Sequence, residues 1–216
     1  ARSVALKAQQ LLSRPGWLWQ VAIKGNPLTF GNLSDAVPEA SNLDSFKQWV
    51  DTQFDASVTW QAIEWLRERW PGKLILKGIL EVDDAKAAVN VGADGIVVSN
   101  HGGRQLDGVA ATARKLPDIV AAVGNDTEIL VDGGIRNGVD VFRALALGAN
   151  GVMIGRPWAW ALAAEGQAGL TRLLNTWQQE LKLAMTLTGV TRIADINETH
   201  LDRTNTNELT QAGEQQ

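Results

Sequence analysis

Two hydrophobic spacings alternate along the chain from about Ser57 onward. Short runs of consecutive apolar residues are typical of buried parallel strands, and apolar residues three or four positions apart are typical of helices. Each run precedes a helical segment, an order that predicts an α/β fold with a parallel sheet and right-handed crossovers. The runs predict strands at 73–77, 95–99, 128–131 and 151–154, and the helical spacing predicts helices at 60–69, 82–91, 110–123, 139–147 and 170–187.

Four strands, each followed by a helix, are half of an eight-stranded barrel. Alone, such a half leaves two strand edges and one face of the core uncovered, which invites unwanted pairing. The chain also starts at Ala1 without an initiator methionine. We therefore expect the functional unit to include a preceding segment or a second chain that completes the fold.

The alternating region divides the chain into three parts. Residues 1–56 are expected to form a helical and loop segment, with a helix up to about residue 14, a loop at 25–44 and a short helix at 45–54. Residues 57–200 are expected to form the half-barrel. Residues 201–216 are polar and are expected to fray.

A tryptophan-rich segment from Trp17 to Ile23 follows Pro15-Gly16, with Arg14 and Lys24 on its flanks. Tryptophans between cations suit a membrane surface, where an apolar face is immersed and the cations meet anionic headgroups. An ordinary amphipathic segment that packs on its own domain has the same pattern and is the more common outcome. The pattern alone leaves both interpretations open.

Composition narrows the range of partners. The 216 residues are 45% hydrophobic with a net charge of −4, and no stretch interleaves basic and aromatic residues, so we expect no nucleic-acid partner. There is no cysteine, which excludes disulfides and thiol catalysis, and two distant histidines argue against a zinc site. No apolar run approaches the roughly 20 residues of a membrane span, and the first residues do not resemble a secretory signal.

The most informative string is Ser99-Asn100-His101-Gly102-Gly103-Arg104-Gln105-Leu106-Asp107-Gly108. It follows a predicted buried strand, so His101 and Arg104 emerge at the carboxyl end of that strand, the face on which barrels carry their chemistry. A base, two glycines that let a flat ligand approach and a forked cation together suit an anionic substrate. Taken singly, such a histidine is more often structural and such an arginine more often solvated.

Two later strand ends combine glycine with arginine. Asp132 to Gly138 follows the third predicted strand, and Gly155-Arg156-Pro157 follows the fourth. In a barrel these are the last two strand-to-helix loops, where backbone N–H groups and helix N-termini commonly bind phosphate. Asp132 would repel a phosphate and is better suited to sugar-like hydroxyls. Three glycines, Gly133, Gly134 and Gly155, would let a phosphate approach the backbone closely. Two arginines, Arg136 and Arg156, would supply positive charge.

Lys77 ends the first predicted strand beside an apolar stretch. If its side chain is buried, it needs an anionic partner or a function, such as stabilising charge on a reduced redox cofactor. If it is not buried, the long side chain reaches solvent at the end of the strand. Both interpretations stay open on the residue alone.

These stretches resemble the C-terminal half of the FMN-dependent α-hydroxy-acid dehydrogenase family, and within it most resemble the bacterial membrane-associated L-lactate dehydrogenases. The resemblance is strong from about Ser57 to Ile196, and its most specific part is the string from His101 to Asp107. It is also carried by residues 76–80, 92–99, 132–136 and 144–149. It implies a TIM (β/α)8 barrel that holds FMN at the carboxyl ends of its strands, with this chain as the C-terminal half.

The resemblance also implies roles for single residues. His101 matches the family's base, Arg104 the residue that binds the substrate carboxylate, and Lys77 the lysine near flavin N1 and O2. Asp132 matches the residue at the ribityl hydroxyls. The remaining residues assigned to the cofactor are Ser99, Gly133, Gly134, Arg136, Gly155 and Arg156, of which the last three lie near the phosphate; none is assigned to a metal.

The implied reaction is oxidation of L-lactate, or a similar 2-hydroxy acid, to the 2-oxo acid. His101 takes a proton from the substrate while two electrons reach FMN, either as hydride or through a carbanion. Quinone of the respiratory chain is the implied acceptor, on the cytoplasmic side of the bacterial inner membrane. Peripheral membrane association would agree with a membrane-facing Trp17 segment, and we also expect a homo-oligomer.

The chain departs from the family in what it lacks. In family members, the N-terminal half supplies tyrosines that bind the substrate and an acidic residue that orients the base. This sequence has no tyrosine. Two alternatives stay open. One is a related dehydrogenase or oxygen-using oxidase for mandelate or glycolate, and the other is a non-catalytic half-barrel that binds a phosphate-bearing ligand and is stable only as a homodimer.

Overall fold

A computed structural model describes residues 6, 9–25, 33 and 43–202 of the chain. Contacts between residues divide the chain into two units, Ala1–Val58 and Thr59–Gln216. The second unit contains all of the strands in the described residues.

The described part of the first unit is mainly helical. Residues 9–12 are helical, and after Arg14 the short helix α2 (Pro15–Trp17) runs into a π-helical segment, η1 (Leu18–Ile23). The predicted break at Pro15 is confirmed, because proline begins a helix more readily than it continues one. Helix α3 (Leu43–Gln53) confirms the short helix expected at 45–54. Most of the loop expected at 25–44 lies outside the described residues, and so do residues 203–216 of the expected tail.

The second unit alternates helices and strands, and its four strands form one parallel sheet in the order β1-β2-β3-β4. This confirms the predicted parallel α/β arrangement. The carboxyl ends of all four strands therefore lie at one edge of the sheet. The elements are α4 (Trp60–Arg69), β1 (Ile75–Ile79), α5 (Val82–Asn90), β2 (Gly95–Val98), η3 (His101–Gly103), α6 (Thr112–Val123), β3 (Glu128–Val131), α7 (Gly138–Ala146), β4 (Gly151–Val152), α8 (Arg156–Leu187), η4 (Ile193–Asp195) and η5 (Glu198–His200).

The two edge strands differ from the prediction. β1 begins at Ile75 and not at residue 73, because the backbone N–H of Leu74 donates to the Asp94 carboxylate (2.9 Å). β4 has two residues in place of the predicted four, although the N–H of Met153 still donates to the Val131 carbonyl (2.8 Å). Lys77 consequently lies within β1, and the chain leaves the sheet soon after β4.

The last long helix also begins earlier than predicted. α8 starts at Arg156, where Pro157 in the first turn favours helix initiation. Non-helical backbone at Glu165 and Gly166 then kinks it. The helix predicted at 170–187 is therefore the second part of α8, and a first part directly follows the last strand.

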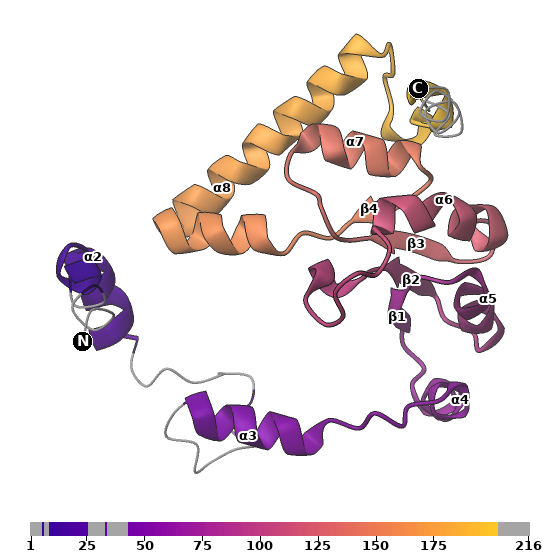
Figure 1. The fold of residues 1–216 in the computed structure, drawn as a ribbon. Helices are drawn as coiled ribbons and strands as arrows, with labels where there is room; N and C mark the ends of the chain where they lie inside the picture. The colour runs from indigo at the N-terminus through magenta and orange to yellow at the C-terminus, as the bar shows by residue number, and fades with distance from the viewer. Residues whose placement is uncertain (1–5, 7–8, 26–32, 34–42, 203–216) are drawn as a thin grey trace, which may run out of the picture. The chain divides into compact units, whose positions relative to one another are not determined.

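Helices α5, α6 and α7 cover one face of the sheet (Figure 1). Their small and branched side chains pack on alternate strand residues to form the main core, and each large aliphatic side chain that is fully buried contributes about 1.5–3 kcal/mol. The fully buried residues of this core are Ala85, Ala88, Ile96, Val98, Leu116, Ile119 and Ile129. α7 in turn packs on α8 so closely that a Cβ at Gly138 would clash with the Trp177 carbonyl.

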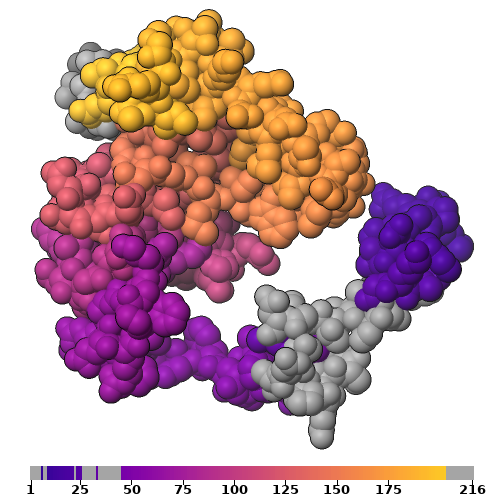
Figure 2. All heavy atoms as spheres, turned by 180° about the vertical axis from the view of Figure 1, so that it is seen from behind, coloured from indigo at the N-terminus to yellow at the C-terminus, as the bar shows by residue number. Residues whose placement is uncertain are grey.

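The first turns of α8, drawn in orange, lie at the surface of the second unit (Figure 2). Trp158 is 41% exposed and Trp160 is 68% exposed. Within the described residues, no helix combines the length and the apolar character needed to cross a membrane.

Asp94 links the amino-terminal ends of β1 and β2, opposite the edge described above. Its carboxylate pairs with Lys73 (2.6 Å) and Arg67 (3.1 Å) and accepts the N–H of Leu74 (2.9 Å). These contacts, led by the Lys73 hydrogen bond, lower the pKa of Asp94 from 3.8 to about 2. Because the pKa is lower in the folded state, the stabilisation is complete above about pH 4 and is lost as the pH falls toward 2.

Replacing this carboxylate tests the link. We expect Asp94→Asn to lower the urea midpoint of unfolding at neutral pH, because an amide cannot pair with two cations. The difference from wild type should shrink as the pH falls from about 4 toward 2. Asp126→Asn, at an exposed position after α6, is the control and should leave the midpoint unchanged. A difference that stays constant over this pH range would contradict the ion-pair explanation.

Candidate active site

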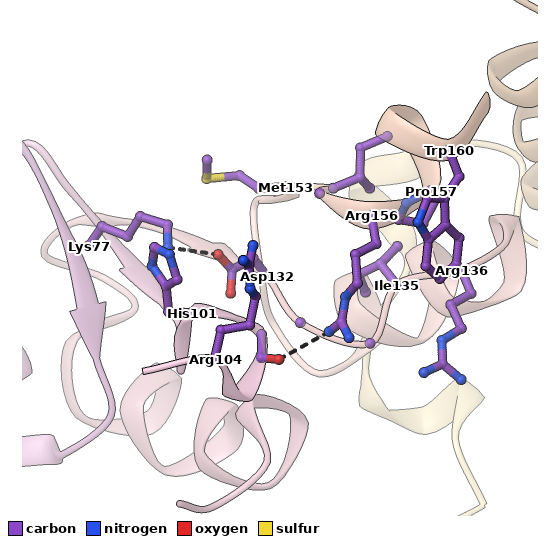
Figure 3. Close-up of a pocket in the computed structure, with 15 residues that line it drawn as sticks. Lys77, His101, Arg104, Asp132, Ile135, Arg136, Met153, Arg156, Pro157 and Trp160 are labelled. Carbon is purple, nitrogen blue, oxygen red and sulfur yellow. Dashed lines mark hydrogen bonds and ion pairs between the residues drawn. The ribbon is translucent and has the colours of Figure 1, made fainter. Parts of the chain in front are cut away.

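Lys77 of β1 and the segments that follow β2, β3 and β4 surround a cavity of about 540 Å³ (Figure 3). Every site residue predicted from the sequence lines it except Ser99, which contacts Lys77. The structure therefore brings the three predicted loops and Lys77 together. The lining residues are Lys77, His101, Gly102, Arg104, Asp132, Gly133, Gly134, Ile135, Arg136, Met153, Ile154, Gly155, Arg156, Pro157 and Trp160.

Lys77 points into this cavity and is paired. Its Nζ lies 3.0 Å from Asp132 Oδ2 and donates to Ser99 Oγ over 2.9 Å. The strand order explains the contact, because Lys77, Ser99 and Asp132 come from β1 and from the ends of β2 and β3, which are neighbours in the sheet. Lys77 has the anionic partner of the first interpretation, although its side chain is 39% exposed and not buried.

Asp132 has one oxygen in this pair and one oxygen left over. Its side chain is 16% exposed, and its Oδ1 is buried with no hydrogen-bond partner among the described residues. A buried carboxylate oxygen without a partner is costly, so a donor from a ligand would stabilise it. A hydroxyl group of a ligand is a suitable donor to Asp132 Oδ1.

The loop after Asp132 brings bare backbone to the cavity. Gly133 and Gly134 have φ angles of 90° and 84°, a region that disfavours other residues. Nothing within 4 Å would meet a Cβ at Gly134 or Gly155, so the space beside both is open. Gly155 also precedes α8 without a side-chain cap, which leaves the first N–H groups of that helix available to an anion.

His101 has a strained backbone and lies beside Lys77 and Asp132 (Figure 3). Its φ of 55° is the positive value of a left-handed conformation, and its N–H donates to Ser99 Oγ (3.1 Å). Ser99 is 2% exposed, so this hydroxyl is a fixed acceptor shared by His101 and Lys77. Strained backbone of this kind is concentrated at functional sites.

Three arginines differ in their surroundings. Arg156 donates from Nη2 to the Gly102 carbonyl (3.1 Å), which links the last loop to the His101 turn. Arg136 lies two residues before α7, its N–H donates to Asp140 (3.0 Å), and its side chain lines the cavity. Arg104 is exposed at the cavity rim. All three place positive charge where an anionic ligand can reach it.

Sequence reasoning missed residues that support or line the cavity. Thr112 donates from Oγ1 to the Asp132 carbonyl (2.7 Å), and Asn100 caps the His101 turn by accepting the Gly103 N–H (3.2 Å). An asparagine before a glycine turn is a recognisable local signal, whereas Thr112 follows the N-cap Ala111 and does not cap α6. The apolar lining residues Ile135, Met153 and Trp160 carry no such signal. Among the described residues, no group of histidine, aspartate and glutamate side chains could hold a metal ion.

Curated proteins match nearly the whole chain. It is 51% identical over 199 residues to "L-lactate dehydrogenase" of Caulobacter vibrioides, which covers 92% of this chain and 52% of that protein. A protein of the same name from Yersinia pestis is 51% identical over 195 residues, covering 90% and 51%. The chain therefore spans about half the length of these relatives.

Solved structures of two enzymes named for mandelate also match this chain. A "monotopic membrane protein (S)-mandelate dehydrogenase" superposes with a TM-score of 0.73 and 37% identity, covering 76% of this chain and 43% of that one. A mandelate oxidase bound to (S)-2-phenylpropionate superposes with a TM-score of 0.63 and 50% identity, covering 65% and 42%.

The family model described as "FMN-dependent dehydrogenase" matches residues 2–203. This confirms the family, and with it the cofactor FMN, that the residues around His101 indicated. Four β/α units are half of the eight in the TIM barrel of this family. The chain belongs to the FMN-dependent dehydrogenase family and carries half of its barrel.

Proposed function

We propose that the protein carrying this chain oxidises L-lactate to pyruvate with FMN as its cofactor. Curated relatives named for this activity match over 90% or more of the chain at 51% identity. Residues 57–200 would serve as the C-terminal half of the barrel. The observation that carries the proposal is the Lys77–Asp132 pair next to His101, because it sets a base and a fixed cation in one cavity.

The residues present suit FMN. The unpartnered Asp132 Oδ1 would accept a ribityl hydroxyl, and the open backbone at Gly134 and Gly155 would admit a phosphate. Arg136 and Arg156 line the same part of the cavity and would neutralise that phosphate. Bound FMN supplies the acceptor for two electrons.

The residues of this chain would share the remaining work. His101 takes a proton from the substrate, and Ser99 holds its backbone N–H. Arg104, free to turn at the rim, binds the substrate carboxylate through two parallel hydrogen bonds. Lys77 keeps a positive charge in the cavity, where Asp132 and Ser99 fix its position.

Replacing the base tests this assignment. We expect His101→Gln to lower kcat for L-lactate by about 10²–10⁴-fold, because glutamine cannot accept the proton. The matched control is His200→Gln at the other histidine, which lies near Phe142 (ring centroids 6.1 Å apart). The measurement is turnover of the full-length holoenzyme with an artificial electron acceptor. Equal effects at both positions would contradict a catalytic role for His101.

The identity of the hydroxy acid is a further part of the proposal. Lactate is favoured by the curated relatives, which match over more of the chain than the mandelate oxidase does. The alternative of an enzyme for mandelate is supported by the names of the solved relatives, and glycolate stays a second alternative from the resemblance. A panel of the three acids, each tested with quinone and with oxygen, separates these possibilities.

The phosphate site can be tested without turnover. We expect Arg156→Ala and Arg136→Ala each to weaken FMN binding by about 10- to 100-fold, the loss that follows removal of a charged hydrogen bond. Riboflavin, which lacks the phosphate, should bind these variants and wild type alike. Arg143→Ala is the control, since this exposed residue pairs with Asp140 (3.3 Å) on α7. The measurement is flavin fluorescence during titration of the apoprotein, and equal losses for both flavins would contradict the assignment.

We also propose peripheral association with a membrane that contains quinone. Trp17, Trp19 and Ile23 are 45%, 52% and 55% exposed. Lys24 Nζ lies 5.6 Å from the Trp19 ring centroid, so a cation accompanies the apolar side chains. The solved relative described as a monotopic membrane protein supports the proposal.

Binding to anionic phospholipid vesicles tests this association. We expect the double variant Trp17→Ser, Trp19→Ser to bind at least about tenfold more weakly, because each tryptophan contributes buried apolar area. Trp65→Ser in α4 is the control, at a tryptophan of similar exposure (57%). Unchanged vesicle binding by the double variant would contradict a membrane role for this segment.

A further inference from the structure

The turn that carries His101 needs support from outside itself. Within the described residues, His101 is the one residue other than glycine with a positive φ. Gly102 and Gly103 follow with φ of 69° and 70°, so three successive residues adopt the left-handed region. A residue other than glycine, here His101, rarely persists there unless neighbouring groups hold it, whereas glycine adopts such φ values freely. The loop onward to Gly108 is exposed and gives little packing of its own.

Asn100 supplies this support from the half-buried position before His101. Its Oδ1 accepts the N–H of Gly103 (3.2 Å), which also donates to the Asn100 backbone carbonyl (3.0 Å), so the side chain reinforces a turn that the backbone already closes. Its Nδ2 donates to the carbonyl of Ala110 (3.3 Å), at the far end of the loop. One side chain therefore joins the beginning and the end of the loop, across ten residues of sequence.

The same side chain also contacts the loop assigned to the cofactor. A Cβ at Gly133 would lie 3.4 Å from Asn100 Oδ1 and 3.1 Å from Thr112 Oγ1, so the amide packs directly against the Gly133 backbone. Thr112 in turn donates to the Asp132 carbonyl (2.7 Å). Thr112 thus holds the Asp132 loop by a hydrogen bond, and Asn100 lies against the same loop at Gly133.

We propose that Asn100 is a positioning residue, which holds the His101 ring in place relative to the cofactor loop without itself touching substrate. This inference rests on the proposed role of His101 as the base. It predicts two separable effects of removing the amide, a looser loop and a slower proton transfer.

Loop mobility can be read without any reaction. Arg104 is exposed within the loop, so trypsin cleavage after Arg104, followed by mass spectrometry of the full-length protein, reports how often the loop opens. We expect Asn100→Ala to speed this cleavage about tenfold, the effect of losing roughly one net hydrogen bond. Asn100→Ser keeps an acceptor near the Gly103 N–H but cannot reach Ala110, and it should lie between alanine and wild type.

The catalytic effect should be larger on kcat than on KM. A base displaced by about 1 Å can lose about 10²-fold in rate, so we expect kcat for L-lactate to fall 10- to 100-fold in Asn100→Ala. KM should rise by a smaller factor than kcat falls, because Arg104, which binds the carboxylate, lies in the same loop but is exposed at the cavity rim. Asn100→Ser should recover part of the rate.

Asn150→Ala is the matched control. The Asn150 side chain also supports backbone, because its Oδ1 accepts the Ile129 N–H (2.7 Å), but it does so at the opposite end of β3. We expect it to lower the urea midpoint while leaving kcat and cleavage after Arg104 unchanged. If Asn100→Ala fails to fold, the serine variant carries the same comparison.

Two results would overturn the proposal. One is cleavage after Arg104 at the wild-type rate in the Asn100 variants, and the other is an equal loss of kcat in Asn100 and Asn150 variants. Failure of the proposed function looks different, because the wild-type holoenzyme would then oxidise none of the hydroxy acids. The cleavage comparison would still decide whether Asn100 holds the loop.

Discussion

The ion pair between Lys77 and Asp132 is the constraint on which the cavity depends. The less exposed member of the pair is Asp132, whose side chain is 16% exposed at the end of β3, and Lys77 of β1 and Ser99 of the β2 end complete the contact. This pairing is available because β1, β2 and β3 are neighbours in one parallel sheet. It fixes a positive charge, and it leaves Asp132 Oδ1 buried and ready to accept a hydrogen bond.

The loops around this pair are joined by hydrogen bonds between different strand ends. Arg156 reaches from the last loop to the Gly102 carbonyl, and Thr112 reaches from α6 to the Asp132 carbonyl. These hydrogen bonds therefore link the His101 turn to the start of α8, and the end of β3 to the start of α6. A ligand that engages Arg156 or Asp132 would act on the neighbourhood of His101 through these contacts.

Much of the fold and the site was predictable from local sequence. Consecutive apolar residues and helical spacing located the strands and helices, and the carboxyl ends of parallel strands meet by geometry, which grouped His101 with Asp132 and Arg156. The start of β1 was not predictable, because it depends on the Asp94 carboxylate of a distant loop. The roles of Asn100 and Thr112 likewise depend on partners ten and twenty residues away. The early start of α8 had a local signal in Pro157, which the apolar spacing obscured.

The most direct test of the central claim is anaerobic addition of L-lactate to the full-length holoenzyme while the visible flavin spectrum is recorded. If the strand ends of this chain form one site for FMN and a 2-hydroxy acid, the flavin absorbance should bleach rapidly, and it should stay unbleached in His101→Gln over the same time. A flavin band that persists in the wild-type protein after lactate, mandelate and glycolate would contradict the proposed function.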